Sequence, residues 1–246
     1  METILITGGT GLVGKAHVKH FLEEYRVVLV YRNDEKLKEF NNHPNLIPIK
    51  IEDLLNDDAV DKIIAELDKK GIYPEHLINM ASDLRWHKMD ENGFAPRECM
   101  VNLYKINVVI PYELTFKLAE HKNSKLKKVI NISSMHGIVP YNPYLYENPK
   151  TQTTPQYSLS KAALIHLTKE LAIRYKDRGI MVNTVSYGGV EGRVNDEFKR
   201  KFAEITPLKR MMQPEDTVPA VNFLIKENSN YMTGQNIIVD GGRTVW

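Results

Sequence analysis

Thr7-Gly8-Gly9-Thr10-Gly11-Leu12-Val13-Gly14 is the stretch of sequence that decides the fold. It follows a short apolar run at residues 3–7 and opens a segment of helical spacing at residues 14–24. Glycines at such a junction permit a tight bend and bring the backbone close to a pyrophosphate, and the helix start supplies free N–H groups. The turn therefore predicts a dinucleotide site. We expect its cofactor contacts to come from Gly8, Thr10, Gly11, Leu12, Val13 and Gly14.

The same alternation of strand and helix continues along the chain. Apolar runs rich in Ile, Val and Leu predict buried parallel strands at residues 3–7, 27–31, 46–51, 76–81, 128–133, 181–186 and 236–239. Helical segments lie between them at residues 14–24, 57–70, 99–121, 156–177 and 215–226. This order predicts an α/β fold: a Rossmann-type, doubly wound parallel sheet of about seven strands with helices on both faces. We expect one domain over residues 1–246, with ligands bound beyond the carboxyl ends of the strands.

Composition narrows the class of protein. The 246 residues are 42% hydrophobic and 26% charged, which is typical of a globular domain. The formal net charge of +2 gives no electrostatic reason to expect a nucleic-acid or membrane partner. The single cysteine, Cys99, cannot form an internal disulfide, and the amino terminus lacks the pattern of a signal peptide. We therefore expect a cytoplasmic protein that acts on a small molecule and holds no metal.

The end of the second strand bears on the choice of cofactor. An acidic residue at that tip would bind the adenosine ribose and disfavour a 2′-phosphate. The sequence there is Val30-Tyr31-Arg32-Asn33, with no acid at the tip, and Arg32 is a charge-assisted donor suited to a phosphate. This favours NADP(H), with NAD(H) as the alternative; a solvated surface arginine is the other interpretation of Arg32.

A tyrosine and a lysine share one face of a predicted helix. Tyr157 and Lys161 stand four positions apart in Tyr157-Ser158-Leu159-Ser160-Lys161. An ammonium group beside a phenol favours the phenolate and lowers the pKa of the tyrosine toward that of a general acid–base. Ser133 and Ser134 end an apolar strand, at the edge of the sheet where a site is expected.

With these residues in place, the chain resembles the short-chain dehydrogenase/reductase family over nearly its whole length. The resemblance rests on TGGTGLVG, Asn79-Met80-Ala81-Ser82, Asn107, Asn131-Ile132-Ser133-Ser134, YSLSK, Thr233-Gly234-Gln235 and Val239-Asp240-Gly241-Gly242. It implies a catalytic tetrad of Asn107, Ser134, Tyr157 and Lys161. In this tetrad Ser134 polarises the substrate oxygen, Tyr157 exchanges a proton with it, and Lys161 also holds the nicotinamide ribose.

The resemblance also implies further contacts and an assembly. The added cofactor contacts are Asp53, Leu54, Ala81, Gly188 and Val190, with adenine near Asp53-Leu54 and nicotinamide near Val190. Residues 191–205 would cover the substrate as a lid. A homotetramer or homodimer would pack through the helices at 99–121 and 156–177, where Leu164, Leu167 and Leu171 recur at helical spacing.

Asn107 has a physical argument of its own. Pro111 lies four residues beyond it inside a predicted helix and has no N–H to bond the Asn107 carbonyl. We expect a kink there. The freed carbonyl could hold a water leading toward Lys161, which is the proton relay that the resemblance implies; a helix that merely bends around the core is the alternative.

Four features depart from the short members of the family. The glycine turn has the spacing TGxxGxxG of a longer, nucleotide-sugar-modifying branch, and Met80 and Ser82 replace an asparagine and a glycine. Tyr187 stands where a proline usually precedes Gly188. Ser134 and Tyr157 are 23 positions apart, longer than usual, and the extra residues fall at 139–155, here called the insertion. Its four prolines and three tyrosines predict no regular element.

The insertion guides the substrate hypothesis, because it emerges beside the catalytic serine. Its polar residues suit a hydroxyl-rich ligand: Tyr141, Asn142, Tyr144, Tyr146, Glu147, Asn148 and Lys150. His136, Arg85 and His87 are placed on the same rim. Alternatively the tyrosines and prolines only brace a surface loop or a subunit contact. A looser resemblance points to bacterial surface-sugar enzymes, including those of nonulosonic acid pathways.

We therefore expect reversible reduction of a ketone to a secondary alcohol by NADPH, on a polar substrate that could derive from a sugar. One alternative is a 3-oxoacyl-carrier-protein reductase, for which Lys199-Arg200-Lys201 is a candidate docking patch. Another is a non-catalytic NADP-binding regulator. An epimerase or dehydratase of the longer branch would fit the glycine spacing, but the chain lacks room for that branch's extra substrate domain.

Overall fold

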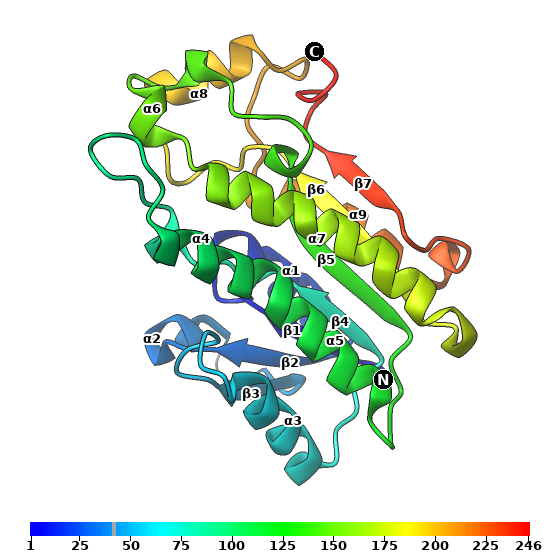
Figure 1. The fold of residues 1–246 in the computed structure, drawn as a ribbon. Helices are drawn as coiled ribbons and strands as arrows, with labels where there is room; N and C mark the ends of the chain where they lie inside the picture. The colour runs from blue at the N-terminus through cyan, green and yellow to red at the C-terminus, as the bar shows by residue number, and fades with distance from the viewer. Residues whose placement is uncertain (41–42) are drawn as a thin grey trace.

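The computed structural model describes residues 1–40 and 43–246. Within them seven parallel strands form one sheet in the order β3-β2-β1-β4-β5-β6-β7 (Figure 1). The strands are β1 (Thr3–Thr7), β2 (Arg26–Tyr31), β3 (Leu46–Lys50), β4 (His76–Asn79), β5 (Lys128–Ser134), β6 (Met181–Tyr187) and β7 (Asn236–Val239). The predicted Rossmann-type architecture is confirmed.

Helices cover both faces of the sheet and make it a three-layer structure (Figure 1). One face packs against α3 (Ala59–Lys70), α4 (Arg97–Tyr104), α5 (Ile110–Glu120) and α7 (Pro155–Arg174). The other face packs against α1 (Leu12–Leu22) and α9 (Val218–Ile225). Because the central strands are buried on both sides, their sequences are apolar without alternation; Ile4, Leu5 and Ile6 of β1 are all fully buried.

The order of the strands fixes where a ligand site lies. The chain runs from β1 outward to β2 and β3, then returns to the other side of β1 with β4. Thr7 at the end of β1 is paired with Val30 on one side and with Asn79 on the other. The carboxyl ends of these three strands therefore meet where the strand order reverses, which is the edge that binds ligands in open α/β sheets.

The long helix predicted at 99–121 is interrupted. A π-helical turn, η3 (Lys105–Val109), separates α4 from α5, and Pro111 stands at the start of α5. Proline has no N–H, so the regular hydrogen-bond ladder cannot run through this point. The predicted distortion at Asn107 is confirmed, and its form is a π turn, a feature often found at functional sites.

Several boundaries and short elements differ from the predictions. The fourth strand ends at Asn79 rather than at 81, because Met80 and Ala81 leave the sheet and line a cavity. The insertion is not irregular throughout: it contains a 3₁₀ turn, η5 (Pro143–Leu145), and one helical turn, α6 (Pro149–Gln152). The short helix α2 (Asp34–Leu37) and the lid helix α8 (Asp196–Glu204) were not predicted.

Two kinds of feature are absent from the part of the chain that the structure describes. None of its helices is long and apolar enough to span a membrane. Among the same residues, no three histidine, cysteine, aspartate or glutamate side chains gather where they could hold a metal ion.

Four histidines are largely buried and burial lowers the pKa of each; the shift is large for three of them, which lie in different places. His17 on α1 is fully buried and its Nδ1 lies 3.1 Å from the Val13 carbonyl oxygen. His87 packs against the Tyr157 ring, and His136 stacks on Tyr141. Burial lowers the pKa of all three imidazoles from 6.5 to about 4, because the charged form loses its hydration.

We expect the free energy of unfolding to fall as the pH drops from 6.5 toward about 4. In that range the unfolded histidines bind protons and the folded ones do not, so each should cost about 2 kcal/mol by pH 5. Urea unfolding at a series of pH values measures this slope. His17→Gln removes one of the three strongly shifted groups and should flatten the slope by about a quarter to a third, because the buried His76 contributes with the same sign; an unchanged slope would contradict the assignment.

Candidate active site

The turn between β1 and α1 presents backbone and little else. Gly8 has a φ of 74°, and a Cβ there would lie 2.7 Å from the backbone of Ala81. A Cβ at Gly14 would lie 2.6 Å from the Cα of Gly9. Gly11 precedes α1 and offers no side-chain cap, so the first N–H groups of the helix remain available. This cradle fits a pyrophosphate, since any larger side chain would fill it.

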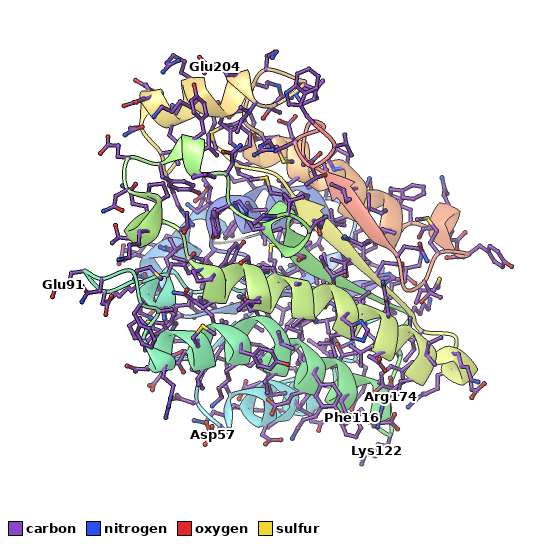
Figure 2. The ribbon with its side chains drawn as sticks, turned by 45° about the horizontal axis from the view of Figure 1, so that its top comes forward. Asp57, Glu91, Phe116, Lys122, Arg174 and Glu204 are labelled. Atoms are coloured by element: carbon purple, nitrogen blue, oxygen red, sulfur yellow. The ribbon has the colours of Figure 1, made fainter. Side chains whose placement is uncertain are left out.

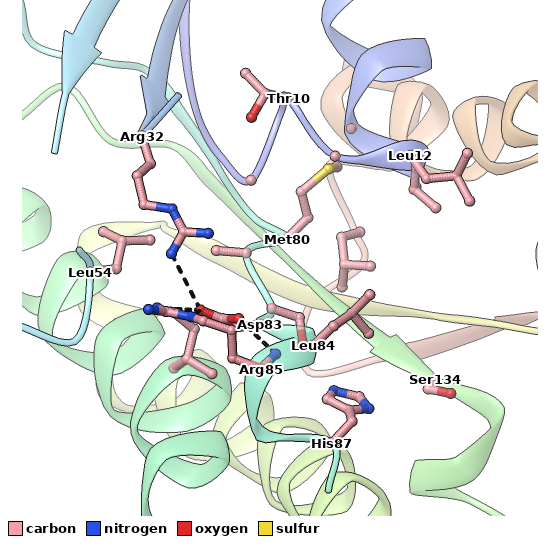
Figure 3. A pocket seen from close by; sticks show the side chains of 18 of the residues that line it. Thr10, Leu12, Arg32, Leu54, Met80, Asp83, Leu84, Arg85, His87 and Ser134 are labelled. Atoms are coloured by element: carbon pink, nitrogen blue, oxygen red, sulfur yellow. Dashed lines mark hydrogen bonds and ion pairs between the residues drawn. The ribbon is translucent and has the colours of Figure 1, made fainter. Parts of the chain in front are cut away.

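A cavity of about 590 Å³ opens at the predicted edge of the sheet (Figure 3). It brings together every residue predicted to contact the cofactor. These are Gly8, Thr10, Gly11, Leu12, Val13, Gly14, Arg32, Asp53, Leu54, Ala81, Tyr157, Lys161, Gly188 and Val190. Ser134 lines the same cavity, so three members of the proposed tetrad share one space with the glycine turn. Their roles remain predictions.

Arg32 at the tip of β2 has an acidic partner that sequence reasoning missed. Its Nη1 lies 3.5 Å from a carboxylate oxygen of Asp83, which follows β4 (Figure 3). Arg85 binds the same carboxylate with Nε at 2.7 Å and reaches Asp53 with Nη2 at 2.6 Å. Although burial works in the opposite direction, the hydrogen bonds from Arg85 hold the pKa of Asp83 below its usual value. Sequence spacing offered no signal for the Arg32–Asp83 and Arg85–Asp53 pairs, because the members of each come from different strand ends.

Ser134, Tyr157 and Lys161 are positioned by β5 and α7. Ser134 is the last residue of β5, and Pro155 at the first turn of α7 starts the helix that carries the other two. The Lys161 Nζ donates a 2.8 Å hydrogen bond to the Ile132 carbonyl and lies 5.8 Å from the centre of the Tyr157 ring. The predicted helical face is therefore real, and it points into the cavity.

The charges around Tyr157 are not those expected. Burial raises the pKa of its phenol, while a hydrogen bond with Ser134 and the positive charge of Arg193 act in the opposite direction. Burial also lowers the pKa of Lys161 to about 7, so near neutral pH this group is only partly charged. The cation that acts on the phenol is Arg193, a lid residue that the sequence analysis did not single out.

Asn107 lies behind α7 rather than in the cavity. It is buried, and its Nδ2 donates a 2.9 Å hydrogen bond to the Ser160 hydroxyl. That hydroxyl donates in turn to the Tyr157 carbonyl at 2.8 Å. Asn107 therefore steadies the first turn of α7, and its Oδ1 has no hydrogen-bond partner among the described residues. A water relay from this position to Lys161 stays a prediction.

The loop after β4 covers the ring of Tyr157. Gln156 is buried and its Nε2 donates a 2.9 Å hydrogen bond to the Lys88 carbonyl, which holds the loop down. The His87 ring then sits 4.6 Å from the Tyr157 ring. Burial and the charge of Lys161 lower the pKa of His87 to about 4, so the imidazole above Tyr157 is uncharged at neutral pH.

The insertion packs on the lid instead of on the substrate side. Tyr141 stacks on His136 with ring centres 3.8 Å apart, and Tyr146 packs against Phe198 of α8 at 5.6 Å. The Tyr144 hydroxyl donates a 2.6 Å hydrogen bond to Glu204, which Figure 2 shows on the same helix. Of the described residues that line the cavity, none comes from the insertion or is His136. Tyr144 and Tyr146 brace the insertion against α8 and Tyr141 packs on His136, which favours the alternative interpretation of the insertion as a braced loop; a ligand contact by these tyrosines stays a prediction.

Comparison with known proteins agrees with this geometry. A family model described as enoyl-(acyl carrier protein) reductase matches residues 13–244. The chain is 32% identical over 248 residues to a 3-oxoacyl-[acyl-carrier-protein] reductase of Rickettsia bellii (strain RML369-C), covering 98% of this chain and 96% of that one. It is 27% identical over 258 residues to a glucose 1-dehydrogenase of Gluconobacter oxydans (strain 621H), covering 100% and 92%. A short-chain dehydrogenase from Leptospira borgpetersenii with bound NAD+ superposes with a TM-score of 0.85 at 27% identity, covering 99% and 92%.

Proposed function

The chain belongs to the short-chain dehydrogenase/reductase family and is an NAD(P)-dependent oxidoreductase, and on this premise we propose that it interconverts a ketone and a secondary alcohol on a polar, sugar-derived substrate. One observation carries the proposal. Ser134, Tyr157 and Lys161 line the cavity that also contains the glycine turn. A substrate oxygen placed between the serine and the tyrosine would thus lie in the same space as a bound dinucleotide.

Each residue of the tetrad has a part in the proposed reaction. A bound nicotinamide cofactor supplies the hydride for reduction and accepts it for oxidation. Ser134 donates a hydrogen bond to the substrate oxygen, and Tyr157 gives that oxygen its proton. Lys161 keeps one donor on the Ile132 carbonyl and has others free for the cofactor ribose. Asn107 holds the first turn of α7 in place and completes the tetrad through a water.

NADP(H) is the proposed cofactor, with NAD(H) as the alternative. Arg32 lies at the cavity edge, 53% of its side chain is exposed, and its contact with Asp83 is long at 3.5 Å. Because Arg85 already holds Asp83, Arg32 can turn to a 2′-phosphate without leaving that carboxylate unpaired. The bound NAD+ in the similar Leptospira protein supports a nicotinamide cofactor without favouring the phosphate.

The rival function is 3-oxoacyl-carrier-protein reduction, which the Rickettsia relative supports. Its candidate docking patch is electrically balanced in this protein. Lys199 pairs with Asp196, Arg200 with Glu204, and Lys201 with Glu197, all within α8. A patch whose cations are already paired gives little attraction to an acidic carrier protein.

We therefore favour a small polar substrate over an acyl group on a carrier protein. The glucose 1-dehydrogenase relative supports a carbohydrate-like compound. We keep bacterial surface-sugar metabolism as the proposed setting and the cytoplasm as the proposed compartment. Three of the four tetrad residues, Ser134, Tyr157 and Lys161, lie together in the cavity, which argues against a non-catalytic regulator.

The proposed homotetramer or homodimer needs a different apolar surface from the one expected. Leu164 and Leu171 are each 1% exposed and belong to the core of the same chain. Apolar side chains that do reach the surface of α4 and α7 are Met100, Val101, Tyr104, Leu159 and Ile173, from 37 to 70% exposed. Arg174 of α7 lies over the Phe116 ring of α5 at 5.6 Å, beside this surface (Figure 2). We propose that a second copy covers these residues.

Tyr157→Phe tests the chemistry. It keeps the ring but removes the proton source, so turnover should fall about 10²–10⁴-fold while NADPH binding stays nearly unchanged. Lys161→Ala should lower both turnover and cofactor affinity, because it removes the proposed ribose contact as well as the ammonium group. Cofactor absorbance and fluorescence titration measure the two quantities. Parental turnover in Tyr157→Phe, with the chemical step rate-limiting, would refute the mechanism.

Arg32→Ala tests the cofactor. Loss of a charge-assisted contact should cost about 1.5–3 kcal/mol, or roughly 10- to 100-fold in NADPH affinity, and leave NADH affinity nearly unchanged. Arg26→Ala, at the exposed start of the same strand, is the matched control and should change neither. Calorimetric titration that finds equal losses for both cofactors would remove Arg32 from this role.

Light scattering tests the assembly. We expect a mass that is two or four times the 28.3 kDa of one chain at micromolar concentration. Val101→Glu should shift the protein toward smaller species, because it places a charge within the proposed interface. Tyr231→Glu, at a fully exposed position outside these helices, should leave the mass unchanged. A monomeric parent protein would contradict the proposal.

A further inference from the structure

Arg193 occupies the lid at a point that is fixed on both sides. On its amino-terminal side, Val190 bridges to Met212 and the Glu191 N–H donates a 2.9 Å hydrogen bond to the Met212 carbonyl. On its carboxyl-terminal side, Asn195 caps the start of α8. Gly192 has a φ of 116°, and a Cβ there would lie 3.2 Å from the Leu12 side chain. The sharp turn at Gly192 therefore presses the chain against α1 and sets the position of Arg193.

Arg193 is a solvent-exposed residue of the lid at the rim of the cavity that contains the reaction centre. It lines the cavity with Ser134, Tyr157 and His87. Burial raises the pKa of Tyr157 and the positive charge of Arg193 opposes that rise, whereas burial lowers the pKa of His87 and the same charge adds to that fall. These two rings pack on each other, so the guanidinium acts on the end of the cavity where the substrate oxygen is proposed to sit.

The charge of Arg193 is not balanced by the protein. Arg32 and Arg85, the other arginines of the cavity, both pair with Asp83. Among the described residues, no carboxylate lies within 4.0 Å of a guanidinium nitrogen of Arg193. His87 adds no charge near neutral pH. Arg193 is thus an arginine at the rim of the cavity with no carboxylate partner among the described residues, and its guanidinium carries five donors in a planar fork.

We propose that the substrate carries a carboxylate near the reacting carbon and that Arg193 binds it. This rests on the proposed ketone–alcohol interconversion and narrows its substrate class to oxo acids and hydroxy acids. One guanidinium satisfies both oxygens of a carboxylate in a bidentate pair, whereas a phosphate group commonly engages more donors than a single fork offers. The reaction remains balanced: hydride goes to the carbonyl carbon, the Tyr157 proton goes to its oxygen, and the carboxylate is unchanged.

A second anion lies within reach of the same region. Gly192 contacts Leu12 of the glycine turn, so a cofactor pyrophosphate could be the group that Arg193 binds. The shared chemistry is a guanidinium–oxyanion pair. The electrostatic effect of Arg193 on Tyr157 and His87 favours the substrate over the cofactor as the source of the oxyanion that it binds. The experiment separates the two.

The test compares 2-oxo and 3-oxo acids of three to six carbons with their methyl esters. For the parent protein we expect kcat/KM for at least one acid to exceed that of its ester. Arg193→Ala should lower the acid-to-ester ratio about 10- to 100-fold, the loss typical of a charged hydrogen-bonded contact, and Arg193→Lys should fall between. Arg200→Ala, an arginine of the same lid that pairs with Glu204, is the matched control and should keep the parental ratio.

Two further measurements make every outcome decisive. Thermal stabilisation of the enzyme–NADP+ complex by the same acids and esters reports binding without turnover; equal stabilisation by acid and ester, or none by any acid, overturns the proposal. Titration of NADPH distinguishes the substrate from the cofactor as the source of the bound oxyanion. If Arg193→Ala weakens only the affinity for NADPH, the arginine binds the cofactor pyrophosphate, and this result also overturns the proposal. If acids and esters are reduced equally and Tyr157→Phe stops both, the proposed function stands and only this inference fails.

Discussion

Backbone packs directly on backbone where β1 passes into α1, and the geometry of the cavity depends on this contact. Gly8 leaves no space for a side chain between the turn and Ala81, and Gly14 leaves none between the first turn of α1 and Gly9. Any Cβ at these points would push α1 away from the sheet or β4 away from β1. The turn therefore does more than admit a pyrophosphate: it sets the separation of the strand ends that form the cavity walls.

A second constraint fixes α7 relative to the sheet. A buried chain of hydrogen bonds runs from Asn79 to Asn131 at 2.9 Å, from Asn131 to Thr168 at 2.9 Å, and from Thr168 to Thr184 at 2.6 Å. It links β4, β5, α7 and β6. Apolar packing alone would allow α7 to slide along the sheet. Displacing any member of the buried hydrogen-bonded chain would leave polar groups unpaired and lower the free energy of unfolding. The positions of Tyr157 and Lys161 thus depend on hydrogen bonds made two to three turns further along the same helix.

Local patterns were enough to predict the sheet, the glycine turn and the face shared by Tyr157 and Lys161, because each depends on residues close together in sequence. The side-chain contacts that were missed in the cavity and the insertion mostly join partners that are distant in sequence. The Asp83 carboxylate reaches Arg32 from a separate strand end, and nothing in either segment indicates the pair. The tyrosines of the insertion had a suitable composition for a ligand site, but composition does not give the direction of a side chain. The aromatic partner of Tyr146 on α8, Phe198, lies more than fifty positions away.

The charges around the phenol connect the lid to the chemistry. Burial disfavours the charged forms of both Tyr157 and Lys161, so the ammonium group is only partly charged near neutral pH and the phenol is drawn toward its protonated form. Arg193 works against that tendency from the lid. A carboxylate paired with Arg193 would offset much of this positive charge at the phenol. Tyr157, whose pKa burial already raises, would then be held still more firmly in its protonated form when an oxo acid is bound, which is the form that reduction requires of a proton donor. On this argument the lid arginine links recognition of the substrate to the protonation state of the catalytic acid.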